Sequence, residues 1–310
     1  MRPLPCLIAA VTLAASAIVA QAAPVGYGEA FDMLYKVDAG ARQAQEIGGA
    51  GRIAGRPVAN ISGLTTTKDG GLLAVTAGSD FKQLIRIDPA SGAASSVGSL
   101  GLAGQGAGQY DALDLNMAAA CAGDLWLTSA SAGKLWRVNP ANGETRLVGP
   151  TGHVVTGLVE RDGVLYGAGG KGENLFYRLD PASGQATPVG PLGPDGWINS
   201  ISLAFDADGT LWAVVNYVPP RTGQEIPAMW NDLATIDPAT GKMTIHGPLT
   251  GPESLREIGM RGFTLGPPQC GAVAASARPV PVRSPWALGL LGLLLAGLAA
   301  RHGAQRKGPR

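Results

Sequence analysis

The sequence predicts an all-β protein, a β-propeller of about five four-stranded blades, and three observations predict it. A tight-turn motif recurs along the body of the chain. A second hairpin turn precedes this motif in most of the repeats. The two ends of the body each lack strands that the other end can supply. Recurrence of one β-unit at a period of tens of residues is typical of propellers, in which units stack because none buries both faces alone.

The turn motif follows a short run of alternating apolar residues. Four copies read LIRIDPASGAASSVG, LWRVNPANGETRLVG, FYRLDPASGQATPVG and LATIDPATGKMTIHG, and a degenerate first copy reads LYKVDAGARQAQEIG. The Asp accepts from the following amides, Pro fixes φ and Gly supplies a positive φ, so each motif predicts a tight turn between two strands. The first polar residue of the turn recurs 41 to 57 residues apart, at Asp38, Asp88, Asn139, Asp180 and Asp237.

A second short turn lies ahead of each of the four full copies. The segments TTTKDGGLLAV, AAACAGDLWLT, LVERDGVLYGA and AFDADGTLWAV each place an Asp/Gly pair between two β-runs, which is typical of a hairpin. Each repeat therefore contributes four short strands, the content of one propeller blade. The predicted full blades span residues 60–98, 111–149, 152–190 and 197–247.

The remaining β-segments predict how the ring closes. Residues Pro24–Gly49 supply three strands without an inner one, and residues Arg261–Leu265 supply one inner strand with nothing after it except Cys270. If the last strand completes the first blade, the ring has five blades and no open edge. The alternative is six blades, with a further strand in Gly48–Asn60 or Pro248–Met260.

With these strands and turns, residues 24–266 resemble the broad group of NHL, YVTN and PQQ-type propeller repeats of bacterial secreted proteins. The resemblance implies a propeller fold. It implies no single activity, because such repeats include lactonases, lyases, dehydrogenases and binding proteins.

The two ends of the chain predict export and membrane contact. Arg2, the apolar run Leu7–Ala20 and the sequence Ala20-Gln21-Ala22 have the layout of a signal peptide. At the other end, an uncharged apolar stretch is followed by arginines and a lysine. We therefore expect a signal peptide (1–22), a β-propeller (23–270), a linker (271–285), a hydrophobic anchor helix (286–300) and a basic cytoplasmic tail (301–310).

The C-terminal segment VPVRSPWAL, with its Leu/Gly/Ala stretch and basic end, resembles the IPTL-CTERM and PEP-CTERM class of bacterial sorting tails. Pro281, Ser284 and Trp286 are the residues that match the sorting motif, whereas Val282, Arg283 and Pro285 depart from the IPTL form. The resemblance implies a Gram-negative envelope or surface protein, held in the inner membrane by residues 286–300 and trimmed by a sorting protease after Pro281.

The net charge limits the classes of partner to be expected, and the cysteine content indicates a covalent link. The formal net charge is +1, so bulk charge indicates no nucleic acid or other polyanion. Of three cysteines, Cys6 lies in the predicted signal peptide and Cys121 and Cys270 remain. An even pair in an exported protein favours a disulfide, with two buried thiols as the alternative.

Candidate ligand-binding residues lie where the chain approaches the inner strands, because these loops share one end of the central channel. They are Asn60, Asp111, Asp114, His153, Trp197, Asn199 and Arg261. A long insertion, NYVPPRTGQEIPAMWND, adds Tyr217 and Trp230 on the same side. Converging polar groups could hold a polar ligand or a metal, or could only satisfy loop backbone and channel water.

The missing catalytic motifs favour a non-catalytic binding or scaffold propeller with an unidentified envelope ligand. No HExxH, CxxC, GxSxG or phosphate-binding loop occurs. The alternative is a metal-dependent, lactonase-like hydrolase or lyase that uses Asp, Asn and His at the channel mouth. A quinone-dependent dehydrogenase is disfavoured because aromatics make up only 5% of the chain. The sequence identifies no cofactor.

Overall fold

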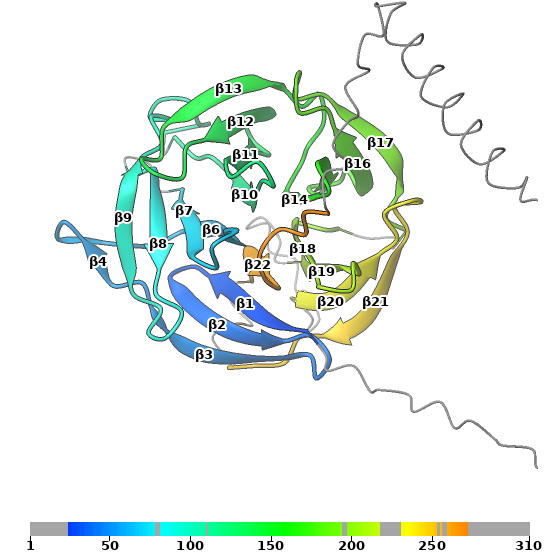
Figure 1. Ribbon diagram of the computed structural model, residues 1–310, viewed down its shortest axis with the longest axis horizontal. Coiled ribbons are helices and arrows are strands. Elements are labelled where there is room, and N and C mark those ends of the chain that lie inside the picture. The colour runs from blue at the N-terminus through cyan, green and yellow to red at the C-terminus, as the bar shows by residue number, and fades with distance from the viewer. Residues whose placement is uncertain are drawn as a thin grey trace, which may run out of the picture. The chain divides into compact units, whose positions relative to one another are not determined.

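The computed structural model describes residues 24–77, 81–109, 111–193, 197–217, 231–252, 255 and 259–271. Within them the chain forms five four-stranded sheets arranged around a central axis as the blades of a β-propeller (Figure 1). The predicted all-β propeller of about five four-stranded blades is confirmed.

Each full blade is four antiparallel strands in sequence order, from the channel outwards. The first blade contains β6 (Ile61–Thr66), β7 (Leu72–Thr76), β8 (Gln83–Ile87) and β9 (Ala94–Ser99). The second contains β10 (Leu115–Ala119), β11 (Leu125–Ser129), β12 (Lys134–Val138) and β13 (Thr145–Pro150). The third contains β14 (Gly157–Arg161), β15 (Val164–Ala168), β16 (Leu175–Leu179) and β17 (Ala186–Pro191). The fourth contains β18 (Ser200–Phe205), β19 (Leu211–Asn216), β20 (Asn231–Ile236) and β21 (Met243–Pro248).

The fifth blade is composite and closes the ring as predicted. It contains β1 (Val25–Ala30), β2 (Met33–Asp38), β3 (Gln43–Gly49) and, as its inner strand, the C-terminal β22 (Gly262–Thr264). Strand β22 pairs antiparallel with β1, with Phe263 opposite Gly28. The segment 48–60 holds only a small hairpin, β4 (Arg52–Ile53) and β5 (Arg56–Pro57), and no sixth blade.

The recurring turns attach each blade to its neighbour. In the first blade, Asp88 accepts hydrogen bonds from the Ala90 amide at 3.0 Å and the Ser91 hydroxyl at 2.6 Å. Gly92 follows at φ +77°, and a Cβ on it would lie 2.2 Å from the carbonyl oxygen of Gly48 in the composite blade. The glycine pair therefore lets the two blades touch backbone to backbone, which explains why most repeats carry both the turn glycine and a glycine at the end of the outer strand.

The degenerate first copy keeps the turn by other means. Arg42 stands where the other copies have glycine, and it adopts a positive φ of +53°. Its guanidinium donates to the carbonyl oxygen of His246 in the fourth blade at 2.5 Å. A side-chain hydrogen bond thus replaces the close glycine contact at this boundary.

Apolar side chains fill the spaces between blades. Five hydrophobic clusters of described residues lie one at each blade boundary. Between the fourth and composite blades, for example, Val214 and Leu233 pack with Tyr35 and Phe263, and all four are buried. Each blade thus buries both faces only through its neighbours, as the repeat pattern predicts.

The predicted signal peptide, anchor helix and sorting motif lie outside the described residues. Of the predicted linker, only the first residue, Gly271, is described. Among the residues that the structure does describe, none belongs to a helix long and apolar enough to cross a membrane.

Strand direction alternates within a blade, so the connections fall on two faces. The Asp/Gly hairpins and the recurring turns share one face, which we call the turn face. The connections between second and third strands, and those leading from one blade into the next inner strand, share the other, which we call the loop face. Those predicted ligand-binding residues that the structure describes belong to the loop face.

Candidate functional site

The inner strands β6, β10, β14, β18 and β22 surround the channel (Figure 1). Asn60, Asn199 and Arg261 lie immediately before or close to the start of β6, β18 and β22. Asn60 is exposed at φ +54°, and its carbonyl oxygen accepts from the Ala77 amide at 3.1 Å. The Arg261 amide donates to the carbonyl oxygen of Glu29 at 2.9 Å. These residues thus occur around the loop-face end of the channel.

Asp111 is fully engaged by its surroundings. Its carboxylate forms a salt bridge with Lys82, a buried residue of the first blade, and accepts from the amides of Gly104 at 2.8 Å and Gly106 at 2.5 Å. The hydrogen bond from Lys82, followed by those from the two amides, lowers the pKa of Asp111 to about 2. Asp111 therefore fastens the loop between the first and second blades.

Asp114 and His153 are likewise paired with residues of the third blade. Asp114 forms a salt bridge with Lys171, and Nδ1 of His153 contacts a carboxylate oxygen of Glu173. The other oxygen of Glu173 accepts from the Val154 amide at 2.9 Å. Burial raises the pKa of Glu173, but the hydrogen bond from the Val154 amide and the effects of the Tyr177 and His153 side chains outweigh it and leave the pKa lowered. The sequence alone did not identify Lys171 and Glu173 as these partners. The available signal was the segment KGEN (171–174), which places two charged residues in one loop between strands.

Of the two aromatic residues predicted in the long insertion, Trp230 lies outside the described residues. Tyr217 lies half-buried at the end of β19 and packs beside the cluster between the third and fourth blades. Burial raises the pKa of the Tyr217 hydroxyl, and the nearby Asp232 carboxylate adds to the effect. Burial also raises the pKa of Asp232 itself. This pair forms the described edge of the insertion.

Glu29 is a buried acid that the sequence interpretation did not single out. Its side chain is 0% exposed, and neither carboxylate oxygen has a hydrogen-bond partner within the described part of the chain. Burial raises its pKa well above the usual value, against the attraction of Arg261. It pairs with Gly262, where a Cβ would lie 2.9 Å from the Glu29 Cγ. The sequence signal for this buried acid was the single Glu in the otherwise uncharged strand VGYGEA.

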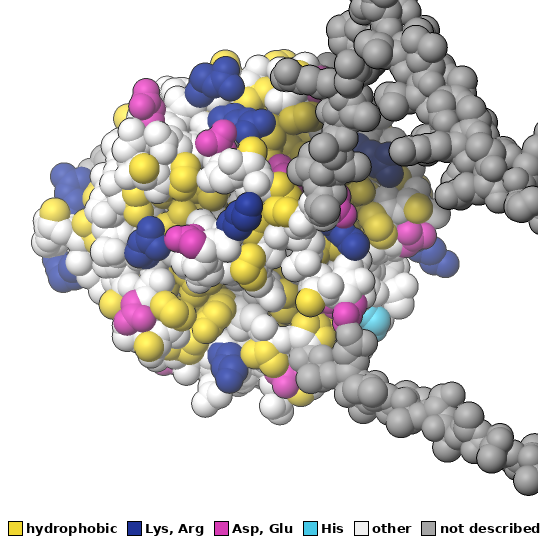
Figure 2. Space-filling model, in the orientation of Figure 1, with side chains coloured by type: hydrophobic (Ala, Val, Ile, Leu, Met, Phe, Trp, Pro, Cys, Tyr) yellow, Lys and Arg dark blue, Asp and Glu magenta, His cyan; other side chains and the backbone are white. Residues whose placement is uncertain are grey.

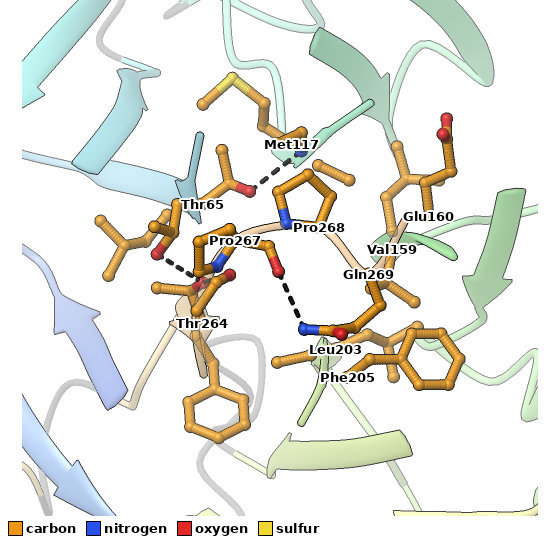
Figure 3. Close-up of a pocket in the computed structure, with 18 residues that line it drawn as sticks. Thr65, Met117, Val159, Glu160, Leu203, Phe205, Thr264, Pro267, Pro268 and Gln269 are labelled. Atoms are coloured by element: carbon orange, nitrogen blue, oxygen red, sulfur yellow. Dashed lines mark hydrogen bonds between the residues drawn. The ribbon is translucent and has the colours of Figure 1, made fainter. Parts of the chain in front are cut away.

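The turn-face end of the channel is closed by the chain itself. After β22, residues Leu265–Cys270, which we call the C-terminal strap, run across the ends of the inner strands (Figure 3). Beneath the strap is a cavity of about 30 Å³, lined by Thr65, Glu160 and Phe205 among others. Such a space holds about one or two waters.

The strap is fixed at its far end. Gln269 forms a β-bridge with Arg161, and its carbonyl oxygen accepts from the Asp162 amide at 2.9 Å. The next residue, Cys270, is joined by a disulfide to Cys121, with the two Cα atoms 5.5 Å apart. The structure therefore contains the disulfide that the sequence favoured, although 149 residues separate the cysteines.

Neither end offers an evident metal centre in the described segments. No group of three or more His, Cys, Asp or Glu side chains there is arranged to hold a metal ion. On the face shown in Figure 2, acidic and basic side chains are interspersed without a continuous patch of one sign.

The family described as "Repeat of unknown function (DUF6923)" matches residues 34–216, more than half of the chain. The chain belongs to the DUF6923 family. The DUF6923 match runs from β2 to the end of β19 and so includes Asn60, Asp111, His153 and Asn199. Tyr217, Arg261 and the strap lie beyond the DUF6923 match.

Solved propellers resemble this DUF6923 protein only distantly. A chain of a nidogen/laminin complex is 14% identical, with coverage of 80% of this chain and 99% of that one and a TM-score of 0.47. A catalytically inactive virginiamycin B lyase from Staphylococcus aureus is 14% identical, with coverage of 72% and 69% and a TM-score of 0.42. Hydrazine synthase from Kuenenia stuttgartiensis is 15% identical, with coverage of 61% and a TM-score of 0.41, and the match spans only 49% of that chain. No curated protein sequence matches the chain.

Proposed function

We propose that this protein is an exported, envelope-anchored β-propeller that acts as a binding module through its loop face. The observation that carries the proposal is the pairing of charged side chains there. Asp111 and Asp114 both lie in the connection from the first blade to the second. Asp111 pairs with Lys82 in the β7–β8 connection of the first blade, and Asp114 pairs with Lys171 in the β15–β16 connection of the third. Side chains fixed in this way form a pre-organised polar surface, which lowers the entropic cost of recognition.

The closed turn-face end of the channel also favours the loop face as the side that binds a ligand. The strap and the Cys121–Cys270 disulfide close the turn-face end, leaving a cavity of only about 30 Å³. A ligand on the axis therefore has to approach from the loop face. The half-buried Asn199 and Arg261 belong to that face.

Export and anchoring rest on the two ends of the sequence. The basic, apolar and A-x-A segments of residues 1–22 support export. The uncharged stretch 286–300 and the sorting motif around Pro281 support retention in a Gram-negative envelope and processing by a sorting protease. The disulfide is consistent with an oxidising compartment.

A metal-dependent hydrolase or lyase, the alternative from the sequence, would need the same acidic side chains as ligands. Asp111 already accepts from a lysine and two backbone amides, so a cation would have to displace these partners. Saturable Ca²⁺ binding measured by calorimetry, if lost in Asp111→Ala and in Asn199→Ala, would support this alternative against the binding module.

Site-specific photocrosslinking in the producing bacterium tests the loop-face proposal. A benzophenone amino acid is placed in the full chain at Ser131, whose hydroxyl accepts from the Asp114 amide, and at Ala90 as the control on the turn face. We expect covalent adducts, identified by mass spectrometry, from position 131 and not from position 90. Adducts from neither position, or equally from both, would contradict the proposal.

A further inference from the structure

Trp197 is a large apolar side chain left open to solvent on the loop face. It is 43% exposed, although its neighbour Ile198 is 1% exposed. The backbone beneath the ring is fixed, because the Lys171 amide donates to the carbonyl oxygen of Ile198 at 2.6 Å and the Asn199 amide donates to that of Asn216 at 2.9 Å. The backbone next to the indole is thus held in place while the ring stays open to solvent, and Trp is enriched at binding interfaces because its apolar ring also carries a polar N–H.

The loop beside the indole leaves one part of it uncovered. Gly172 approaches Trp197, and a Cβ on this glycine would lie 3.6 Å from Cζ3 of the ring. Gly172 adopts φ +94°, which disfavours any residue with a side chain. The β15–β16 connection therefore supports the indole without covering it.

Two polar residues flank Gly172 in the same loop. Lys171, on one side of Gly172, pairs with Asp114, and the two side chains are 33% and 37% exposed. Glu173, on the other side, contacts His153, and these side chains are 28% and 31% exposed. Each pair is held in place and still partly open, so it can offer donors and acceptors to a ligand.

We propose that Trp197 and the loop Gly169–Asn174 form a binding subsite for a neutral pyranose saccharide. This proposal rests on the proposed function of the loop face. The flat apolar ring suits the C–H face of a pyranose, and the adjacent polar groups suit its hydroxyls. The Lys171–Asp114 pair carries no net charge, so it does not favour an anionic ligand. An apolar peptide would lack apolar neighbours, because the adjoining loop residues are Lys171, Gly172 and Glu173.

Binding of three soluble oligosaccharides to the full-length protein in detergent tests the subsite. Cellohexaose, maltoheptaose and the hexamer of N-acetylglucosamine are titrated by calorimetry, with a heparin hexasaccharide as the anionic comparison. We expect at least one neutral probe to bind, with affinity at least tenfold weaker in Trp197→Ala and largely retained in Trp197→Phe. The matched control is Leu147→Ala on the outer strand β13, where Leu147 is 53% exposed, and it should leave affinity unchanged.

The subsite is overturned if no neutral probe binds, if only heparin binds, or if Trp197→Ala and Leu147→Ala weaken binding equally. Failure of the saccharide class remains distinguishable from failure of the loop-face proposal. Adducts from position 131 without oligosaccharide binding would retain the binding module and exclude the saccharide. Absence of those adducts would count against the binding module itself.

Discussion

The carboxylate of Glu160 accepts a hydrogen bond across a blade boundary from the indole N–H of Trp126, at 2.5 Å. Glu160 lies on β14 of the third blade, and its other oxygen accepts from the Cys121 amide at 2.8 Å in the second blade. The side chain is 6% exposed and lines the cavity beneath the strap. One buried acid therefore fixes two positions of its neighbour, including the backbone of a disulfide cysteine.

Glu160→Gln should destabilise the protein. An amide retains one acceptor oxygen where the carboxylate has two, so one of the two buried N–H donors loses its partner, at a cost of about 1–3 kcal/mol. The measurement is the free energy of unfolding in urea at pH 7. The control is Glu144→Gln at an exposed position. Equal stability of the two variants would show that the bridge contributes nothing.

Removal of the disulfide should weaken the closed ring. Cys121→Ser with Cys270→Ser should lower the free energy of unfolding by about 2–5 kcal/mol, because the unfolded chain regains the freedom that a long covalent loop denies it. Urea unfolding measures the change. Reductant should destabilise the parent protein by a similar amount and leave the double variant unaffected. A double variant as stable as the parent would contradict the prediction.

Glu29→Gln should change the pH dependence of stability. Burial raises the pKa of Glu29, so the native state keeps its proton at pH values where the unfolded chain has lost it. As pH rises above about 4.5, the free energy of unfolding therefore falls until pH passes the native pKa. Gln stays neutral, so the variant's advantage over the parent should grow through this window, by about 1.4 kcal/mol for each unit of the raised pKa.

The measurement for Glu29 is urea unfolding of both proteins at several pH values from 4 to 8. The control is Glu46→Gln, because Glu46 is exposed. Its difference from the parent should change little over the same range. A difference between Glu29→Gln and the parent that stays constant as pH rises would show that the carboxyl is ionised without penalty in the native state.

Gly92→Ala should destabilise more than Gly70→Ala, although both glycines have a positive φ, of +77° and +87°. Alanine in the left-handed region costs about 1–2 kcal/mol at either position. At Gly92 the new Cβ would also lie 2.2 Å from the Gly48 carbonyl oxygen, whereas at Gly70 nothing lies within 4 Å. Thermal or urea unfolding of the two variants measures the difference, which reports the backbone contact between blades. Equal losses would contradict that contact.

The blades could be predicted because each is encoded locally. The alternating apolar residues, the Asp/Gly hairpins and the Asp-Pro or Asn-Pro turns recur in every full repeat, and the observed strands lie within a few residues of the predicted blades. The sequence also shows a glycine at the end of the outer strand of each repeat, but nothing within the repeat itself explains it. Its reason lies in the neighbouring blade, as Gly92 and Gly48 show.

The surroundings of the candidate site could not be predicted, because they depend on contacts between distant loops. Asp111 and His153 were identified as polar residues near the channel, but their partners Lys82 and Glu173 belong to other connections. The disulfide raised a related difficulty. Counted around the ring, Cys121 and the composite blade are not neighbours, yet the strap crosses the channel, where the inner ends of all blades converge.

The bond between Cys121 and Cys270 also determines how the protein would respond to a mechanical load. The ring seam at β22 consists of a three-residue strand, Gly262–Thr264, paired with β1. A pull on the chain beyond Cys270 passes through the sulfur atoms into the second blade before it reaches that seam. Tension on the C-terminal side is therefore borne by a covalent link and an intact four-stranded sheet, and the short strand that closes the circle is shielded from peeling.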